Sequence, residues 1–452
     1  MSLLLAAVSF LGAGALLSLV LAEHPRASRA AALVCLAGGC LTGLLPALLV
    51  LAGGQLSPAL IPWSVPLGAI SIAIDPLSAF FLVPVFAVGL AAGVYGEGYL
   101  EASHGHLPAA SVRFFYFLLT ASMAVVVCAR NAVLFLAAWE VVALAAFFLV
   151  CAEDRKPEVR RAGLIYLLCT HLGTLCLFVF FAVMGSRAGS MDFSAMKAAM
   201  PGPGPTLAGL AALALAGFGM KAGVMPLHFW LPEAHPVAPS HASAVLSAVV
   251  LKMGVYGLLR FISFCPVVPE SWGFVLLTLG AASALLGVLF AMLQHDLKRL
   301  LAYSSIENIG IIFMGTGLGC VGLAHGNPLI AALGFTAALL HVLNHSLFKS
   351  LLFLGAGAYN QALGSRAIEG AGGLLRRMPW TSLFAWTAAA AACGLPPLNG
   401  FIGEWLLYRG LIGGGLAAGT RFVVFASAAL ALVGGLAAAC FTMAYGTLTL
   451  GE

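Results

Sequence analysis

Six ionisable side chains occur inside long apolar stretches of this sequence. They are Glu140, Lys221, Lys252, Glu307, Lys349 and Glu404. In lipid, an ionisable side chain near the centre of a helix costs at least ~2.5 kcal/mol, so its presence indicates function by default. The structural alternatives are snorkelling toward the membrane surface and an ion pair that only joins helices. Six such residues in successive apolar stretches favour the functional interpretation.

Histidines join these residues at helical spacings. His341, His345 and Lys349 follow one another at intervals of four, which predicts one polar stripe along a helix. His241 and Lys252 are eleven residues apart, so a continuous helix would place them on one face, about 16 Å apart along its axis. We interpret the isolated His171 and His228 differently, as hydrogen-bonded core residues.

Buried lysines beside carboxylates suit proton transfer. Burial disfavours a charged lysine, and a nearby carboxylate favours it again. At ~4 Å, two unit charges interact by about 4 kcal/mol at an effective dielectric constant of ~20. Forming or breaking such a pair therefore changes the proton affinity of the lysine about a thousandfold. That change is sufficient to load and unload a proton.

The elements that position these residues must lie in a membrane. Of 452 residues, 8% are charged and 62% are hydrophobic, whereas about a quarter of a soluble domain is charged. This composition excludes a water-soluble fold and predicts an all-α polytopic membrane protein in the lipid bilayer. The net charge of +5 comes from scattered basic residues, so nucleic-acid binding is not expected. The ten cysteines include no CxxC pair, and we interpret them as reduced core residues.

A spanning helix needs about 20 mostly apolar residues, and the chain divides into thirteen candidate spans. These are 2–22, 30–53, 73–98, 112–129, 131–152, 161–186, 206–231, 240–264, 272–293, 300–320, 328–359, 380–408 and 418–447. The first span has no basic flank or cleavage site, so we expect a retained helix rather than a signal peptide.

Two of these helices are interrupted. The seventh contains Pro226 near Lys221, and the twelfth contains Pro396 and Pro397 before Glu404. Such breaks are tolerated in lipid where neighbouring helices or water satisfy the freed backbone groups. Because the breaks lie five helices apart, they predict two inverted five-helix repeats, helices 4–8 and 9–13.

The predicted domains follow from these repeats. Residues 1–111 hold the first three helices, 112–264 the first repeat and 272–447 the second. Twelve basic residues fall in one set of alternating loops and six in the other, and the three buried lysines complete the 21. Because cytoplasmic loops are enriched in Lys and Arg, the N-terminus is predicted outside and the C-terminus inside. The predicted location is a bacterial or archaeal cell (inner) membrane.

Seven motifs follow one another along most of the chain. They are DPLSAFF at 75–81, WE at 139–140, MKAGVMPLHFWLPEAHPVAPSHASA at 220–244, LKMGVYGLLR at 251–260, HDLKRLLAYSSIENIGI at 295–311, LNHSLFKSLLFLGAG at 343–357 and LPPLNGFIGEW at 395–405. With these motifs, the segment from about residue 75 to 445 resembles the antiporter-like membrane subunits of complex I, multisubunit Na⁺/H⁺ antiporters and membrane-bound hydrogenases. Within them, the sequences PEAHPVAPSHASA, SSIENIG and LPPLNGF most resemble those of hydrogenase-4 component B and the equivalent formate hydrogenlyase subunit.

This resemblance implies a proton-conducting module of a larger complex. Glu140 and Lys221 would form a coupling pair. A hydrated axis would then continue through Lys252, the eleventh helix (His341, His345 and Lys349) and Glu404. Relatives usually carry a fourteenth helix, whereas this chain stops after the thirteenth, which raises the possibility of a truncated or divergent subunit.

The leading hypothesis is therefore a proton-translocating subunit of a complex I-like or group 4 hydrogenase-type redox complex. The expected partners are other membrane subunits and peripheral redox subunits with iron–sulfur clusters. The sequence has no cysteine set for such clusters and no nucleotide-binding motif, so we expect no cofactor and no redox active site in this chain. The alternatives are a cation/proton antiporter subunit without redox coupling and a passive membrane scaffold.

Overall fold

The computed structural model describes residues 1–63, 68–103, 106–370, 372–417 and 421–451, apart from the side chains of 415–417, 421 and 422. Within this part, twelve helices are long and apolar enough to cross a membrane. The polytopic all-α fold is thereby confirmed. The exact helix count and the inverted repeats stay predictions. The chain divides into two compact units.

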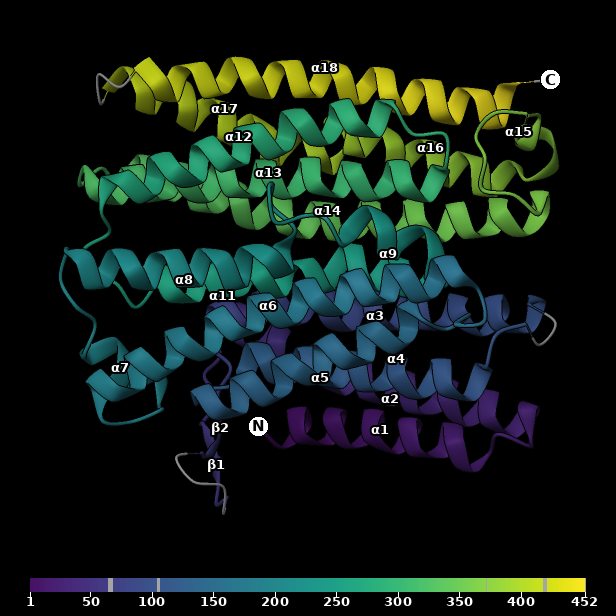
Figure 1. The fold of residues 1–452 in the computed structure, drawn as a ribbon, viewed down its shortest axis with the longest axis horizontal. Coiled ribbons are helices and arrows are strands. Elements are labelled where there is room, and N and C mark those ends of the chain that lie inside the picture. Colours follow the sequence, from purple (N-terminus) through teal and green to yellow (C-terminus); the bar gives the residue numbers. More distant parts are fainter. Residues whose placement is uncertain (64–67, 104–105, 371, 418–420, 452) are drawn as a thin grey trace. The chain divides into compact units, whose positions relative to one another are not determined.

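Unit 1 comprises Met1–Ala222 and Val237–Cys265. Its helices α1 to α6 lie side by side with nearly parallel or antiparallel axes (Figure 1). The elements of unit 1 are α1 (Ser2–Val20), α2 (Pro25–Leu51), β1 (Ala59–Ile61), β2 (Ile70–Ile72), α3 (Pro76–Ala102), α4 (Ala109–Cys128), α5 (Ala132–Val150), α6 (Pro157–Ala188), α7 (Phe193–Ala198), α8 (Pro205–Ala222), α10 (Ser240–Val245), the π-helix η1 (Leu246–Val250) and α11 (Leu251–Ile262).

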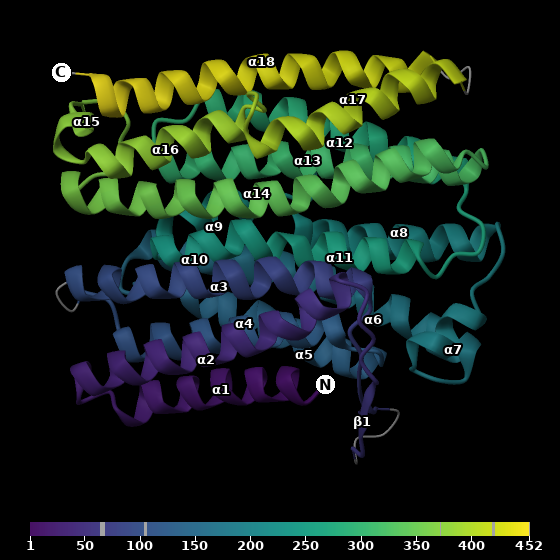
Figure 2. The same cartoon turned by 180° about the vertical axis from the view of Figure 1, so that it is seen from behind.

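Unit 2 comprises Gly223–Pro236 and Pro266–Glu452. In it α13 packs between α12 and α14, and α17 and α18 pack against this group (Figure 2). Its elements are α12 (Glu270–Met292), α13 (Leu297–Ala324), α14 (Pro328–Leu363), α15 (Leu374–Arg377), α16 (Pro379–Ala392), α17 (Asn399–Ala417) and α18 (Arg421–Leu450), together with all but the last residue of α9 (Leu231–Val237).

Two predicted spans are not continuous α-helices. The predicted helix 206–231 ends as α8 at Ala222, and Pro226 lies between it and α9. The predicted helix 380–408 is divided into α16 and α17, with Pro396 and Pro397 between them, and neither piece is among the twelve long apolar helices. A glycine of positive φ follows each helix end, Gly223 at 75° and Gly394 at 64°. Glycine adopts this left-handed conformation without the cost that a Cβ atom would impose.

A third predicted span, 240–264, is also not one continuous α-helix, because it contains a π-helical turn. Five residues, Leu246–Val250, form η1 between α10 and α11. This turn interrupts the α-helical periodicity between His241 and Lys252. The same-face spacing predicted for these two residues assumed a continuous α-helix, and that assumption was wrong.

The short β1–β2 hairpin of unit 1 forms backbone hydrogen bonds with the segment that connects α4 and α5. Its strands pair antiparallel, with Leu60 opposite Ser71. Ile72 forms a further bridge with Ala129, and Arg130 N–H donates to the carbonyl of Ser71. The backbone of this junction therefore finds hydrogen-bond partners although it belongs to neither helix.

Close glycine contacts set the distance between α12 and α13 in unit 2. A Cβ atom on Gly310 would lie 2.4 Å from Ala284 N and 2.5 Å from Gly280 O. Membrane helices approach most closely where such small residues line the interface.

We predict that Gly310→Ala lowers the stability of the protein by about 1–3 kcal/mol, because the added methyl group forces α12 and α13 apart. The matched control is Gly434→Ala in α18, where a Cβ atom meets nothing within 4 Å. Thermal unfolding of the detergent-solubilised variants measures both. Equal midpoints for the two variants would contradict the close approach of α12 and α13.

Candidate functional site

Unit 1 positions four predicted site residues: Glu140 on α5, Lys221 on α8, His241 on α10 and Lys252 on α11. Lys221, His241 and Lys252 are buried, whereas the side chain of Glu140 is 25% exposed. These residues come from helices far apart in the sequence, so the fold itself gathers them in one unit.

Lys221 lies in the last turn of α8, directly before the break. Its ammonium nitrogen is 5.5 Å from the centre of the Trp139 ring and 5.9 Å from that of Tyr166. Among the described residues, Lys221 Nζ has no hydrogen-bond partner. The two aromatic faces attract a cation, but they do not replace the hydrogen bonds that water would give it.

The carboxylate of Glu140 points to a different partner. Its Oε2 lies 3.6 Å from Nε2 of His171 on α6. Among the described residues, Oε1 is buried without a hydrogen-bond partner, and no ion pair joins Glu140 to Lys221, although the two interact electrostatically. An apolar cavity of about 340 Å³ opens beside Glu140 between α5 and α6.

Lys252 follows the π-helical turn directly. Its ammonium group donates a hydrogen bond of 2.6 Å to the carbonyl of Ser247, which lies inside η1. π-Helical turns in α-helices often occur at functional sites. Here the turn supplies an acceptor to a charge that would otherwise be costly to bury.

His241 packs beside a buried ion pair. Its ring centre is 5.7 Å from those of Tyr99 and Tyr116. Arg113 donates to Glu97 at 2.6 Å, and both side chains are at most 10% exposed. These two residues, His241 and Tyr116 line a common cavity of about 20 Å³, which has room for one water molecule.

Unit 2 gathers the other five predicted site residues, which are all buried: Glu307 on α13, His341, His345 and Lys349 on α14, and Glu404 on α17. Because α14 is a continuous α-helix, the intervals of four residues place the two histidines and Lys349 along one face. Lys349 donates to the carbonyl of Leu301 at 3.2 Å and lies 5.5 Å from the centre of the Phe441 ring.

Glu307 connects the charges of this cluster. It interacts electrostatically with both Lys349 and Glu404. Ser304, one turn earlier, donates a hydrogen bond of 2.9 Å to Glu307 Oε2. Glu307 therefore interacts with a lysine and with a second carboxylate in a buried region. Such a set cannot be fully ionised without a large cost, so its charge depends on protons that it shares.

Two side-chain amides form hydrogen bonds in this region, Asn308 beside Glu307 and Asn344 at the break between α16 and α17. Asn308 donates to the carbonyl of Ser304 at 2.8 Å, which turns its oxygen toward His341 Nε2 at 3.0 Å. His341 Nε2 therefore carries the hydrogen. At the break, Asn344 donates at 2.7 Å to the carbonyl of Asn399.

Glu404 packs into the same break. A Cβ atom on Gly394 would lie 2.7 Å from Glu404 Oε2, so only a glycine leaves room for this carboxylate. The break thus supplies both the space around Glu404 and a carbonyl for Asn344. Asn399 is the first residue of α17, so Asn344 binds the start of the helix that carries Glu404.

Three residues that contact the predicted site residues were not recognised from the sequence: Ser304 and Asn308 in unit 2 and His171 in unit 1. Ser304 and Asn308 lie three residues before and one residue after Glu307, a spacing that indicated a polar helix face. His171 was interpreted as a core residue, yet its side chain is 46% exposed and lies against Glu140. No spacing within one helix shows this contact, because the two residues belong to α5 and α6.

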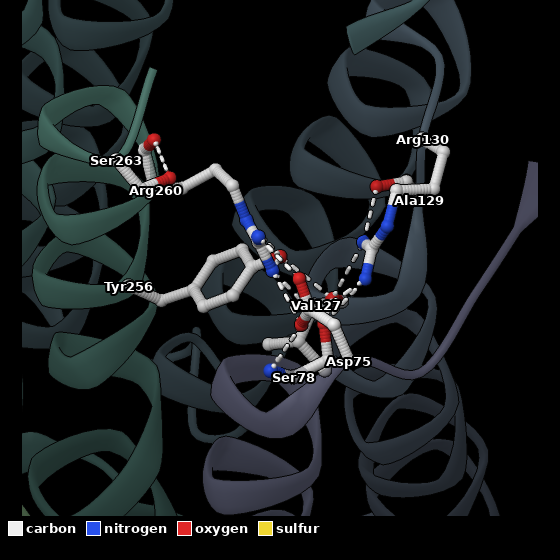
Figure 3. Close-up of polar contacts among 8 residues, drawn as sticks. All are labelled: Asp75, Ser78, Val127, Ala129, Arg130, Tyr256, Arg260 and Ser263. Carbon is white, nitrogen blue, oxygen red and sulfur yellow. Dashed lines mark hydrogen bonds and ion pairs between the residues drawn. The ribbon is translucent and has the colours of Figure 1, made fainter. Parts of the chain in front are cut away.

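Unit 1 also holds a charged cluster at the start of α3 (Figure 3). The carboxylate of Asp75, which caps α3, accepts hydrogen bonds from Arg260 and lies 3.2 Å from Arg130. Both arginines also donate to the hydroxyl of Ser78. Tyr256 donates to the carbonyl of Val127 at 2.7 Å. The cluster joins α3, α11 and the α4–α5 junction.

This cluster determines the ionisation of Asp75. Burial alone would raise the pKa of Asp75, but the hydrogen bond and charge of Arg260, with the charge of Arg130, hold it well below its usual value. Since the pKa is lowered in the folded state, the resulting stabilisation is present above the unfolded value near pH ~4 and is lost as the pH falls below it.

We predict that Asp75→Asn lowers the free energy of unfolding by about 1–2 kcal/mol at pH 7, a figure reduced for the partial exposure of the carboxylate. Thermal unfolding between pH 8 and pH 3 measures this. The difference from the unsubstituted protein is expected to be constant at neutral pH and to narrow below about pH 4. A difference that is absent at pH 7 would show that Asp75 does not stabilise the fold.

Among the described residues, no group of three or more His, Cys, Asp and Glu side chains is arranged as metal ligands would be. The predicted site residues of the two units are instead lysines, carboxylates and histidines.

Comparison with known proteins shows the family of this chain. The family model described as NADH:quinone oxidoreductase/Mrp antiporter, TM, matches residues 129–432. The chain belongs to this family. The resemblance predicted from the motifs is therefore confirmed, and the family match spans all nine candidate proton-transfer residues named from the sequence.

Curated members of the NADH:quinone oxidoreductase/Mrp antiporter family include two similar Escherichia coli proteins. Hydrogenase-4 component B is 39% identical over 383 residues, which cover 83% of this chain and 56% of the relative. Formate hydrogenlyase subunit 3 is 36% identical, and the match covers 84% of this chain and 61% of that protein. The chain thus spans little more than half the length of these relatives.

Solved structures of two membrane complexes contain chains with the same fold. A chain of the Mrp complex from Dietzia sp. has a TM-score of 0.83 at 22% identity, over 100% of this chain and 81% of its own length. A chain of the archaeal membrane-bound sulfane sulfur reductase has a TM-score of 0.81 at 25% identity, over 99% and 69%.

Proposed function

We propose that the chain is a proton-translocating membrane subunit of a complex I-like or group 4 hydrogenase-type redox complex. The observation that carries this proposal is that each unit holds buried lysines and histidines together with carboxylates that interact with a lysine, within a chain of the NADH:quinone oxidoreductase/Mrp antiporter family. Structural ion pairs need only two groups of opposite charge, whereas unit 2 gathers two carboxylates, one lysine and two histidines.

In unit 2, protons would pass between side chains that exchange them at short range. Glu307 interacts with Lys349 and with Glu404, so a proton that binds to one of the three changes the proton affinity of the others. His341 is hydrogen-bonded to Asn308, the residue that follows Glu307 in the sequence. The Asn308 amide fixes the position of the imidazole ring beside the cluster.

In unit 1, the charge of Glu140 would control Lys221. Lys221 Nζ lies among aromatic rings without a hydrogen-bond partner in the described part of the chain, so a carboxylate that moves toward it favours the charged form. Lys252 would take part from its position after η1. A continuous proton-transfer axis through the site residues of both units stays a prediction.

We propose that this subunit works with partners that hold the redox groups. Its relatives include proteins named as a hydrogenase component and as a formate hydrogenlyase subunit. In this proposal the peripheral subunits carry iron–sulfur clusters and this chain carries no cofactor. The proposed orientation is N-terminus outside and C-terminus cytoplasmic, from the distribution of Lys and Arg.

Neutralising Lys221 or Glu140 in unit 1 tests the proposal. We predict that Lys221→Ala and Glu140→Gln each reduce redox-driven proton translocation at least about tenfold, because each removes one member of the coupled pair. The measurement uses vesicles that contain the intact complex, with proton uptake and electron transfer recorded together. The control is Lys197→Ala, an exposed lysine on α7, which is expected to leave both rates unchanged.

Each alternative function gives a different result. Full proton translocation in both variants would contradict the proposal and favour the passive scaffold. Proton movement that needs sodium or potassium and continues without electron transfer would favour the cation/proton antiporter, a function named for a Rhizobium meliloti relative, a probable K⁺/H⁺ antiporter subunit that is 34% identical.

A further inference from the structure

The contact between Glu140 and His171 has a consequence for the pairing of Glu140 with Lys221. His171 lies on the outer face of α6, where its neighbour Leu172 is 57% exposed. Its Nε2 is 3.6 Å from Glu140 Oε2, and its Nδ1 is 3.0 Å from the carbonyl of Leu167. Both nitrogens of the ring therefore face an oxygen atom.

These two contacts define the protonation state in which the arrangement is stable. A backbone carbonyl only accepts hydrogen bonds, so Nδ1 must carry a hydrogen. In a neutral ring Nε2 would then present a lone pair to the carboxylate, which is repulsive. With Glu140 ionised, only the imidazolium makes the contact of 3.6 Å attractive, as an ion pair rather than a hydrogen bond.

The carboxylate of Glu140 has a second potential partner in Lys221. In the described part of the chain, Glu140 interacts with His171 and Tyr166 on α6 and with Lys221 on α8. In the described part of the chain, Lys221 Nζ and Glu140 Oε1 both lack hydrogen-bond partners. The Glu140 carboxylate thus lies within ion-pair distance of His171 and interacts electrostatically with Lys221.

We propose that His171 is a second cationic partner of Glu140 that competes with Lys221, so that loss of its proton releases Glu140 to the lysine. The role of this competition in transport rests on the proposed function, proton translocation. While the imidazole ring is protonated, it holds the carboxylate of Glu140 away from Lys221. When the ring has lost its proton, the Glu140–Lys221 pair forms.

The competition itself can be measured without transport. Nitrogen NMR of the purified protein with labelled histidine follows the protonation of His171, and His171→Gln assigns its signal. We predict that Glu140→Gln lowers the pH midpoint of this signal by about one unit or more, a tenfold change in the equilibrium, because the counter-charge is lost. Lys221→Met is expected to raise the midpoint, because Glu140 then serves His171 alone.

The control is Lys197→Met on α7, an equal loss of charge at an exposed position, which is expected to leave the midpoint unchanged. An unchanged midpoint in Glu140→Gln would show that His171 is not paired with Glu140. An unchanged midpoint in Lys221→Met would show that the two cations do not compete. Either result overturns the proposal.

A second experiment links the competition to transport. In vesicles with the intact complex, His171→Gln is expected to shift the acid limb of the proton-translocation profile to lower pH, whereas Leu172→Gln, at the adjacent exposed position of α6, leaves it in place. A profile that does not move in His171→Gln overturns the transport role of His171. If the unsubstituted complex moves no protons, the proposed function fails, and the NMR titration still decides the competition.

Discussion

The cost of placing charge in a low-dielectric membrane governs this structure. Every lysine and carboxylate within the helices needs a counter-charge, a carbonyl or an aromatic face, since lipid offers none. Lys252 and Lys349 each donate to a backbone carbonyl, and Lys221 lies between two aromatic rings. The charges that remain incompletely satisfied are the ones whose proton affinity responds most to their neighbours.

Irregular backbone supplies what regular helices cannot. The π-helical turn η1 presents the Ser247 carbonyl to Lys252, and the break between α16 and α17 presents the Asn399 carbonyl to Asn344. Gly394 leaves room for the carboxylate of Glu404 in the same break. Outside these segments the helices pack closely through glycines, as at Gly310, and the Asp75 cluster joins α3 to α11. Regular packing thus holds the irregular segments in place.

The sequence predicted the fold class, the two helix breaks and the polar stripe of α14, because hydropathy, proline and four-residue spacing are local properties. It did not predict the π-helical turn, since no residue type in 246–250 marks it. Nor did it predict the contact of His171 with Glu140, which depends on how α5 and α6 pack. Ser304 and Asn308 were recognisable in principle from their distance to Glu307, but only packing shows that Asn308 faces His341.

The central claim is that the buried lysines of both units carry protons that electron transfer drives across the membrane. The most direct test is the number of protons moved per electron transferred, measured in vesicles with the intact complex and with the double variant Lys221→Ala, Lys349→Ala. The account predicts that the ratio falls by the whole contribution of this subunit while the fold and electron transfer persist. An unchanged ratio in a correctly assembled double variant would contradict it.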